Sequence, residues 1–313
     1  MGFEEVKELA KILKEKDNFL VATHLGYDND ALGSLISLGL ILEKLNKNFL
    51  IYLEEDLRPQ YKFLPLQEKF IKEPKIFDVA VVVDCDRLSR AGENFYSFIK
   101  DKFTILIDHH QTNIKDADFN LVMNTNSTAE IIYYLAKELK IDFDKDLATA
   151  FLLGILGDTL ILTVEMEKEQ LLENFDIVKD LIEKGGDYYL IIDVLKNKDW
   201  DDFKKVIEKG REAILEDNIL FLLIEDEENT VEDMSNFLSQ VRDAKIIIVF
   251  QKREKGIKIS LRSKGNIDVG YLAKNYFNGG GHQNAAGGYL EMDLGSVKNF
   301  VLEKVKEYLK NVN

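Results

Sequence analysis

A carboxylate and two imidazoles stand side by side as Asp108, His109 and His110, directly after the apolar run 103–107. The run is rich in β-branched and large apolar residues, which predicts a strand. Successive side chains of an extended segment point to opposite sides, so one imidazole can bind a metal ion while its neighbour faces elsewhere. Asp108 is then available to orient a ring by a hydrogen bond. A pair of surface histidines is the alternative interpretation.

Acidic residues occur at three further places where a chemical role competes with a structural one. His24, Asp28 and Asp30 lie between an expected strand and an expected helix. A histidine with two carboxylates suits a divalent cation such as Mn²⁺, although both acids could instead begin and cap the helix. Asp84 follows a buried apolar run, where a turn or cap aspartate is the alternative. Asp158 interrupts another apolar segment, and there a buried ion pair competes with a metal ligand.

A run of glycines precedes the last histidine of the chain. Three consecutive glycines are favoured neither by a strand nor by a helix, so a loop is expected. Such a loop exposes backbone N–H groups that can bind an anion of phosphate size, whereas a hinge or a tight turn is the alternative. The residues expected to form the anion site are Gly279, Gly280, Gly281, His282, Asn284, Arg262 and Ser263.

All 4 His of the chain fall in these segments, and the order of the segments resembles a known family. Residues 24–34 are similar to the first motif of the DHH phosphoesterase superfamily, 84–86 to the second, 108–110 to the third and Asp158 to the fourth. Residues 260–288 resemble the signature of the DHHA1 domain. Within that branch the chain looks most like the nanoRNase/pAp phosphatases, also called bifunctional oligoribonucleases.

Two positions depart from the family pattern. Tyr27 stands where the first motif commonly has proline, which alters the stiffness of the loop and leaves the ligand types unchanged. The fourth motif usually reads Thr-Asp-Thr-Gly, but residues 157–160 read Gly-Asp-Thr-Leu. The aspartate is retained and bulk is added beside it, so the departure bears on substrate preference more than on chemistry.

The resemblance implies a pair of divalent cations, usually Mn²⁺, with Mg²⁺ or Co²⁺ as alternatives. The implied ligands of one cation are His24, Asp28 and Asp84. Those of the other are Asp30, Asp84, His109 and Asp158. Asp108 would lie behind the ligands and His110 would face the scissile phosphate, so the implied catalytic residues are Asp84, Asp108 and His110. The residues implied to bind substrate are His110, Arg262, Ser263, Gly279, Gly280, Gly281, His282 and Asn284.

The elements that must position these residues form an α/β pattern. Apolar runs separated by helical segments predict a mainly parallel sheet covered by helices on both faces, with strands at 18–23, 48–55, 77–84 and 103–108. A smaller α/β domain follows, with strands at 218–225, 244–252, 256–263 and 287–293. The expected division is a DHH domain at 1–186, a helical connector at 187–206 and a DHHA1 domain at 207–313, with the active-site cleft between the domains.

Composition limits the class of protein and its partners. The apolar run 147–156 is too short to cross a bilayer, and one cysteine excludes an intrachain disulfide framework. These features favour a cytoplasmic protein without a membrane partner. A net charge of −15 argues against stable binding of a long nucleic acid, which usually needs a basic stripe. A short oligonucleotide or nucleotide substrate is therefore expected, and a homodimer is an open possibility for the assembly.

The leading hypothesis is a metal-dependent phosphoesterase that hydrolyses very short oligonucleotides to 5′-mononucleotides and also pAp to AMP. Two bridged cations would activate water and clamp the attacking and leaving oxygens. A cyclic or linear dinucleotide phosphodiesterase and a RecJ-like single-strand exonuclease are alternatives within the same class. A non-catalytic nucleotide sensor is the alternative from another class, and the sequence does not separate a polyphosphatase from a nucleotide hydrolase.

Overall fold

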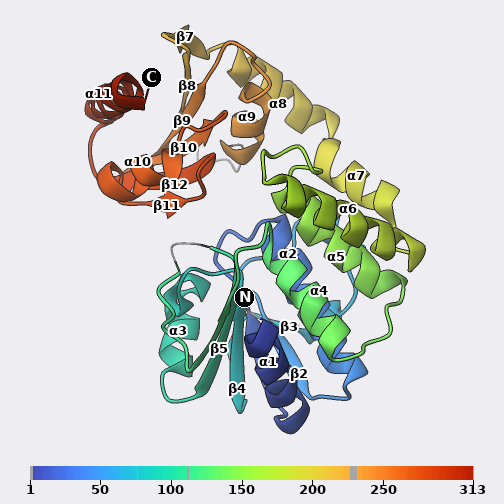
Figure 1. Cartoon of the computed structure of the whole chain (residues 1–313). Helices are drawn as coiled ribbons and strands as arrows, with labels where there is room; N and C mark the ends of the chain where they lie inside the picture. The colour runs from blue at the N-terminus through green and yellow to red at the C-terminus, as the bar shows by residue number, and fades with distance from the viewer. Residues whose placement is uncertain (1–2, 76, 111–112, 226–230, 313) are drawn as a thin grey trace. The chain divides into compact units, whose positions relative to one another are not determined.

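The structure is a computed structural model that divides into two compact units, each with its own sheet and helices (Figure 1). The residues that it describes are 3–75, 77–110, 113–225 and 231–312. The first unit is Met1–Asn197 and the second is Lys198–Asn313. Their boundary falls inside the connector expected over 187–206, so α7 (Tyr188–Lys196) belongs to the first unit and α8 (Trp200–Gly210) to the second.

The first unit is built on a six-stranded sheet in the order β3-β2-β1-β4-β5-β6. Its strands are β1 (Phe19–Ala22), β2 (Phe49–Tyr52), β3 (Phe70–Ile71), β4 (Val79–Val83), β5 (Phe103–Asp108) and β6 (Phe119–Val122). Every neighbouring pair is parallel, which confirms the predicted sheet type. The short edge strands β3 and β6 were not predicted, because neither contains the long apolar run that marks a central strand.

Both faces of this sheet are buried, and alternate residues of each strand serve different layers. The helices of the unit are α1 (Phe3–Glu15), α2 (Asn29–Lys44), α3 (Glu93–Ile99), α4 (Thr128–Glu138), α5 (Lys145–Asp158), α6 (Lys168–Glu183) and α7, with short 3₁₀ turns at Pro59–Tyr61, Gln67–Lys69 and Leu88–Ala91. Val21 and Val81 pack with α1, α2, α4 and α5. Leu20 and Val82 pack instead with α3 on the other face.

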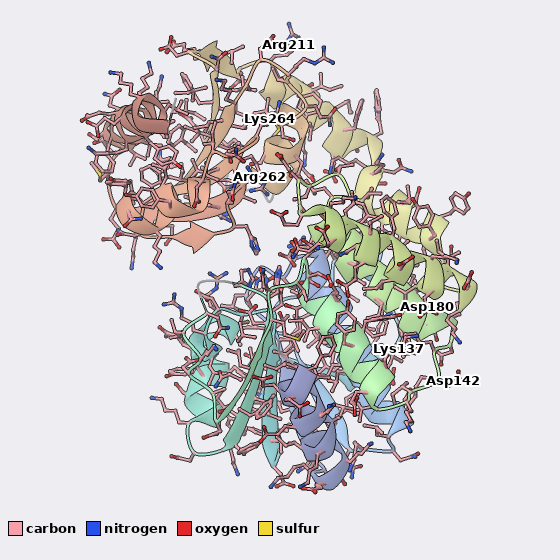
Figure 2. The ribbon with its side chains drawn as sticks, in the orientation of Figure 1. Lys137, Asp142, Asp180, Arg211, Arg262 and Lys264 are labelled. Carbon is pink, nitrogen blue, oxygen red and sulfur yellow. The ribbon has the colours of Figure 1, made fainter. Side chains whose placement is uncertain are left out.

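Helices α4 and α6 are joined at their exposed sides by a charged hydrogen bond. Lys137 Nζ lies 2.7 Å from Asp180 Oδ2, and Figure 2 shows the two side chains coming from α4 and α6. The hydroxyl of Tyr133 donates to the same oxygen at 2.7 Å. Helix α4 is therefore fixed to helix α6 by two hydrogen bonds to one carboxylate oxygen.

The second unit is a mixed sheet in the order β11-β12-β10-β9-β8-β7, parallel at the β8–β9 pair and antiparallel at the others. Its strands are β7 (Ile214–Glu216), β8 (Ile219–Ile224), β9 (Ile246–Arg253), β10 (Gly256–Ser263), β11 (Gly280–Gly281) and β12 (Ala285–Leu290). One expectation was wrong here. The glycine run, expected to be a loop, contains strand β11.

Helices cover both faces of this second sheet as well. They are α8, α9 (Val231–Leu238), α10 (Val269–Tyr276) and α11 (Leu294–Val312). One face packs against α10 and α11 through residues such as Phe250 and Leu261, and the other packs against α8 and α9 through Ile247 and Val249. Among the described residues, every helix falls short of the length and apolarity that a bilayer crossing needs.

Candidate metal centre

The candidate ligands gather where neighbouring strands of the first sheet end. His24 follows β1, Asp84 comes directly after β4, and Asp108 is the last residue of β5. The chain leaves β1 toward β2 on one side and returns to β4 on the other, so the strand order reverses between β1 and β4. Parallel α/β sheets bind their ligands at such a switch point, outside the carboxyl ends of the strands.

Glycines bring helices α2 and α5 close enough to place acids from both helices at this edge. A Cβ added to Gly33 would lie 2.5 Å from the backbone nitrogen of Gly154, and one added to Gly154 would lie 2.9 Å from Oδ1 of Asp30. No larger residue fits between these helices without moving backbone. Close packing thus carries Asp30, in the first turn of α2, and Asp158, at the end of α5, to one place.

The first group of possible ligands is His24, Asp28 and Asp84. His24 Nε2 lies 3.9 Å from Oδ2 of Asp28 and 3.8 Å from Oδ2 of Asp84. Asp28 also caps α2, because its Oδ1 accepts from the backbone nitrogen of Ala31 at 2.9 Å. Asp28 can therefore cap the helix through Oδ1 and bind a cation through Oδ2, so the two roles expected for this residue are compatible.

The second group is centred on His109, which is 4% exposed. Its Nε2 lies 3.8 Å from Oδ2 of Asp30, 3.5 Å from Oδ1 of Asp84 and 3.5 Å from Oδ2 of Asp158. Asp84 thus presents one oxygen to each group. The structure brings together all six residues predicted as metal ligands.

His110 lies against the second group but has a different partner. Its Nδ1 donates to Oδ1 of Asp108 at 2.7 Å, and the other oxygen of Asp108 accepts from Asn113 Nδ2 at 2.7 Å. Although burial lowers the pKa of His110, the hydrogen bond to Asp108 and the charge of Asp84 outweigh it and raise that pKa to about 10. The ring that Asp108 orients is therefore that of His110.

Electrostatics at the centre favours a bound cation. Burial and then the charge of Asp84 raise the pKa of Asp30 well above its usual value. Burial also acts to raise the pKa of Asp84, but the nearby imidazoles of His24, His110 and His109 outweigh burial and lower it. Buried carboxylates that repel one another and face neutralising imidazoles suit divalent cations, because cations relieve the repulsion and match the oxygen and nitrogen donors.

The N-terminus of α4 supports two of the ligands, and the sequence reasoning missed it. The backbone nitrogens of Thr128 and Ala129 donate to the two oxygens of Asp30 at 2.6 and 2.9 Å. The hydroxyl of Thr128 donates to Oδ1 of Asp84 at 2.8 Å. The available signal was the capping-box spacing of Ser127 and Glu130, which marks a helix start.

Backbone conformations that side chains disfavour occur beside the ligands. Asp84 has a φ of 58°, and Leu160, Ile161 and Leu162 have φ values of 46°, 62° and 59°. Such conformations cost non-glycine residues about 1–3 kcal/mol each. The turn that follows Asp158 is held by Thr159, whose hydroxyl donates to Ile155 and accepts from the backbone nitrogen of Leu162. Leu160, which stands where the family pattern has glycine, therefore lies in a left-handed turn next to the candidate ligand Asp158.

The predicted anion-binding residues lie together in the second unit. Arg262 on β10, labelled in Figure 2, is paired in register with Ala285, and Asn284 donates to Ser263 Oγ at 3.0 Å. The backbone nitrogens of Gly279 and His282 donate to Ala273 and Ala285 inside the fold. These two N–H groups are engaged within the fold and so are not among the backbone donors expected to bind an anion.

The glycines of this run are required by close approach of backbones. A Cβ on Gly279 would lie 1.8 Å from the carbonyl oxygen of Gly287, and a Cβ on Gly281 would lie 2.5 Å from that of Ala285. Gly281 also has a φ of 140°, which a larger residue rarely adopts. Packing of β11 on β12 therefore accounts for the glycines, and Arg262 with His282 remains the proposed part of the anion site.

Residues 18–155 match the DHH family, N-terminal domain, and residues 216–311 match the DHHA1 domain. The chain therefore belongs to the DHH family of phosphoesterases, in the form that carries a DHHA1 domain.

Individual relatives cover nearly the whole chain. The bifunctional oligoribonuclease and PAP phosphatase NrnA of Thermus thermophilus is 28% identical over 317 residues, which is 98% of this chain and 95% of that protein. Cyclic-di-AMP phosphodiesterase GdpP of Geobacillus thermodenitrificans is 26% identical over 96% of this chain and 49% of its own length. A solved exopolyphosphatase-related protein from Bacteroides fragilis shares the fold, with a TM-score of 0.84 at 20% identity over 97% of this chain and 96% of its own.

Proposed function

We propose that this DHH-family protein hydrolyses very short oligonucleotides to 5′-mononucleotides, and pAp to AMP, with the help of two divalent cations. The observation that carries the proposal is the shared carboxylate of Asp84. Its Oδ2 faces His24 at 3.8 Å and its Oδ1 faces His109 at 3.5 Å. A carboxylate that presents one oxygen to each of two groups of possible ligands would be able to hold both cations.

The donor set supports Mn²⁺ as the preferred cation, with Mg²⁺ and Co²⁺ as alternatives, because imidazole nitrogens are combined with carboxylate oxygens. We assign one cation to His24, Asp28 and Asp84. We assign the other to Asp30, Asp84, His109 and Asp158. When bound, the cations supply a water of lowered pKa and neutralise charge on the phosphate.

His110 is proposed to act on the phosphate directly. Its side chain is 25% exposed, compared with 3% for that of His109. Asp108 engages Nδ1 and fixes the plane of the ring, and Asn113 in turn fixes Asp108. A positively charged imidazole held in this way stabilises the negative charge that develops on the phosphate oxygens.

The substrate is proposed to be short because the chain has little positive charge for a long one. Its net charge is −15, so cations and a few basic groups must neutralise the phosphates. Arg262 and His282 of the second unit are proposed to bind the terminal phosphate. The name of the Thermus thermophilus relative, an oligoribonuclease and PAP phosphatase, supports the same substrate class. We place the enzyme in the cytoplasm, where such nucleotides occur.

The test is Mn²⁺-dependent hydrolysis of a dinucleotide, a 20-mer and pAp, with chromatographic identification of the products. Asp84→Asn is expected to lower the rate at least about 100-fold, because loss of a bridging ligand exceeds the 10–100-fold cost typical of supporting residues. Asp101→Asn, which changes an exposed aspartate before β5, serves as the matched control. Full activity of Asp84→Asn would refute the two-cation site, and equal or faster cleavage of the 20-mer would refute the short-substrate proposal.

A cyclic dinucleotide is the second candidate substrate, favoured by the 26% identity to a cyclic-di-AMP phosphodiesterase. Adding cyclic di-AMP and linear pApA to the panel distinguishes the candidates. Preferential cleavage of the cyclic compound would replace the first proposal. Nucleotide binding without any turnover in saturating Mn²⁺ would instead indicate a sensor.

A further inference from the structure

Thr128 is a fully buried polar residue that contacts two candidate ligands at once. Its backbone nitrogen lies 2.6 Å from Oδ2 of Asp30, and its hydroxyl lies 2.8 Å from Oδ1 of Asp84. These are the same two oxygens that face Nε2 of His109, at 3.8 and 3.5 Å. One residue therefore holds, through two different donors, the two carboxylate oxygens that surround the most buried imidazole of the centre.

Hydrogen bonds made by the neighbouring residues Ser127 and Glu130 fix the position of Thr128. Thr128 is the first residue of α4, and Ser127 caps that helix by accepting from the backbone nitrogen of Glu130 at 3.1 Å. The carboxylate of Glu130 accepts from the backbone nitrogen of Asn126 at 3.2 Å and from Asn174 Nδ2 on α6 at 3.3 Å. Hydrogen bonds on both sides of Thr128 thus leave its two donors little freedom to move.

We propose that Thr128 is a positioning residue that sets the spacing of the Asp30 and Asp84 carboxylates and thereby controls the affinity for divalent cations. The inference rests on the proposed function only in that it uses the same cation site. The hydroxyl is the critical group, because it is the donor of Thr128 that reaches Asp84, whereas Asp30 is also held by the backbone nitrogen of Ala129 at 2.9 Å. Carboxylate ligands whose hydrogen-bonding partners are lost typically bind metal 10–100-fold more weakly.

A merely structural role is the competing explanation, since a buried hydroxyl next to a helix start needs an acceptor in any case. The chain offers a matched control at Thr104. That residue is also buried, and its hydroxyl also donates to an aspartate, Asp118 Oδ2, at 2.9 Å. Thr104 is the second residue of β5, whereas His109 follows the opposite end of the strand. Thr104→Val therefore removes the same kind of hydrogen bond away from the centre.

The experiment measures binding of Mn²⁺ alone by isothermal titration calorimetry, and the stability of the metal-free protein by urea unfolding. The full chain is used for Thr128→Val, Thr128→Ser, Thr104→Val and wild type. Thr128→Val is expected to bind Mn²⁺ about 10–100-fold more weakly. Thr128→Ser keeps both donors and is expected to bind within about threefold of wild type. Thr104→Val is expected to lose stability and keep wild-type affinity.

Wild-type affinity in Thr128→Val, with a loss of stability like that of Thr104→Val, would overturn the proposal. If Thr128→Val does not fold, Thr128→Ala, which also lacks the hydroxyl and favours helix, takes its place with the same expectation. A wild-type protein that binds Mn²⁺ but cleaves none of the proposed substrates would refute the proposed function and leave this inference standing. A wild-type protein that binds no divalent cation would refute both.

Discussion

Replacement of Gly154 by alanine tests whether close packing of α5 creates the centre. The new Cβ would lie 2.4 Å from the Cβ of Ala129 and 2.9 Å from Oδ1 of Asp30. Neither neighbour can move cheaply, because Ala129 belongs to the first turn of α4 and its backbone nitrogen holds that same oxygen at 2.9 Å. The contact must therefore be relieved by a shift of α4, of α5 or of the Asp30 side chain.

The magnitude follows from two opposing effects. Alanine in a helix interior is favoured over glycine by about 1 kcal/mol, whereas overpacking of a well-packed core costs about 1–3 kcal/mol. The difference is a net loss of about 0–2 kcal/mol in the free energy of unfolding for Gly154→Ala. Movement of Asp30 should also weaken Mn²⁺ binding about 10-fold or more.

Urea unfolding and calorimetric titration with Mn²⁺ measure the two effects. Gly295→Ala is the control, because this exposed glycine lies in helix α11 and its added Cβ would come no closer than 3.4 Å to Asp293. The control should be neutral or slightly stabilising. If Gly154→Ala proved as stable as wild type and bound Mn²⁺ equally well, the close approach of α2, α4 and α5 would not be what positions Asp30.

Three further perturbations test the assigned roles. His109→Ala should lower Mn²⁺ affinity, whereas His110→Ala should keep the metal and lower turnover about 100-fold or more; equal loss of metal in calorimetry would refute this division. Asp180→Asn should cost about 1 kcal/mol at neutral pH. The pKa of Asp180 is lowered, since burial is outweighed by the hydrogen bonds from Lys137 and Tyr133. Its contribution is thus present above the ordinary aspartate pKa of about 3.9 and is lost as pH falls through the lower folded-state value. Urea unfolding should show a wild-type advantage at pH 7 that shrinks as the pH is lowered below that ordinary value. Arg262→Ala should raise KM for a dinucleotide more than it lowers kcat, and an unchanged KM would remove Arg262 from the substrate site.

The elements that carry the site could be predicted because their signals are local. β-Branched runs such as 77–84 mark central parallel strands, and Asp84 and Asp108 stand at strand ends, where parallel sheets bind ligands. All 4 His of the chain fall in the segments that resemble the family motifs, which marks those segments as functional. The alternation of side chains expected for an extended segment was wrong at His109 and His110, because β5 ends at Asp108 and the two rings lie 4.7 Å apart, at 3.5 and 3.9 Å from the same Oδ1 of Asp84.

Other features depend on contacts between distant parts of the chain and leave no local signal. Thr128 holds Asp30 across a sequence separation of 98 residues, and nothing in the residues around Thr128 indicates that partner. Local preference predicts a loop at the glycine run, whereas pairing of Gly280 with Gly287 makes it a strand. The left-handed backbone at Leu160 also contradicts the preference of its exposed side chain, and the hydrogen bonds of Thr159 to Ile155 and Leu162 hold the turn in which it lies.

The proposed ligands have a thermodynamic consequence because they lie far apart in the sequence. They run from His24 to Asp158 and lie on segments that meet only when the parallel sheet and its helices are assembled. An unfolded chain offers no such site, so the free energy of cation binding adds to the free energy of folding of the first unit. At a free cation concentration 100 times the dissociation constant, that gain is about 2.7 kcal/mol. The concentration of free divalent cations would then set the stability of the DHH domain to unfolding and proteolysis, as well as its activity.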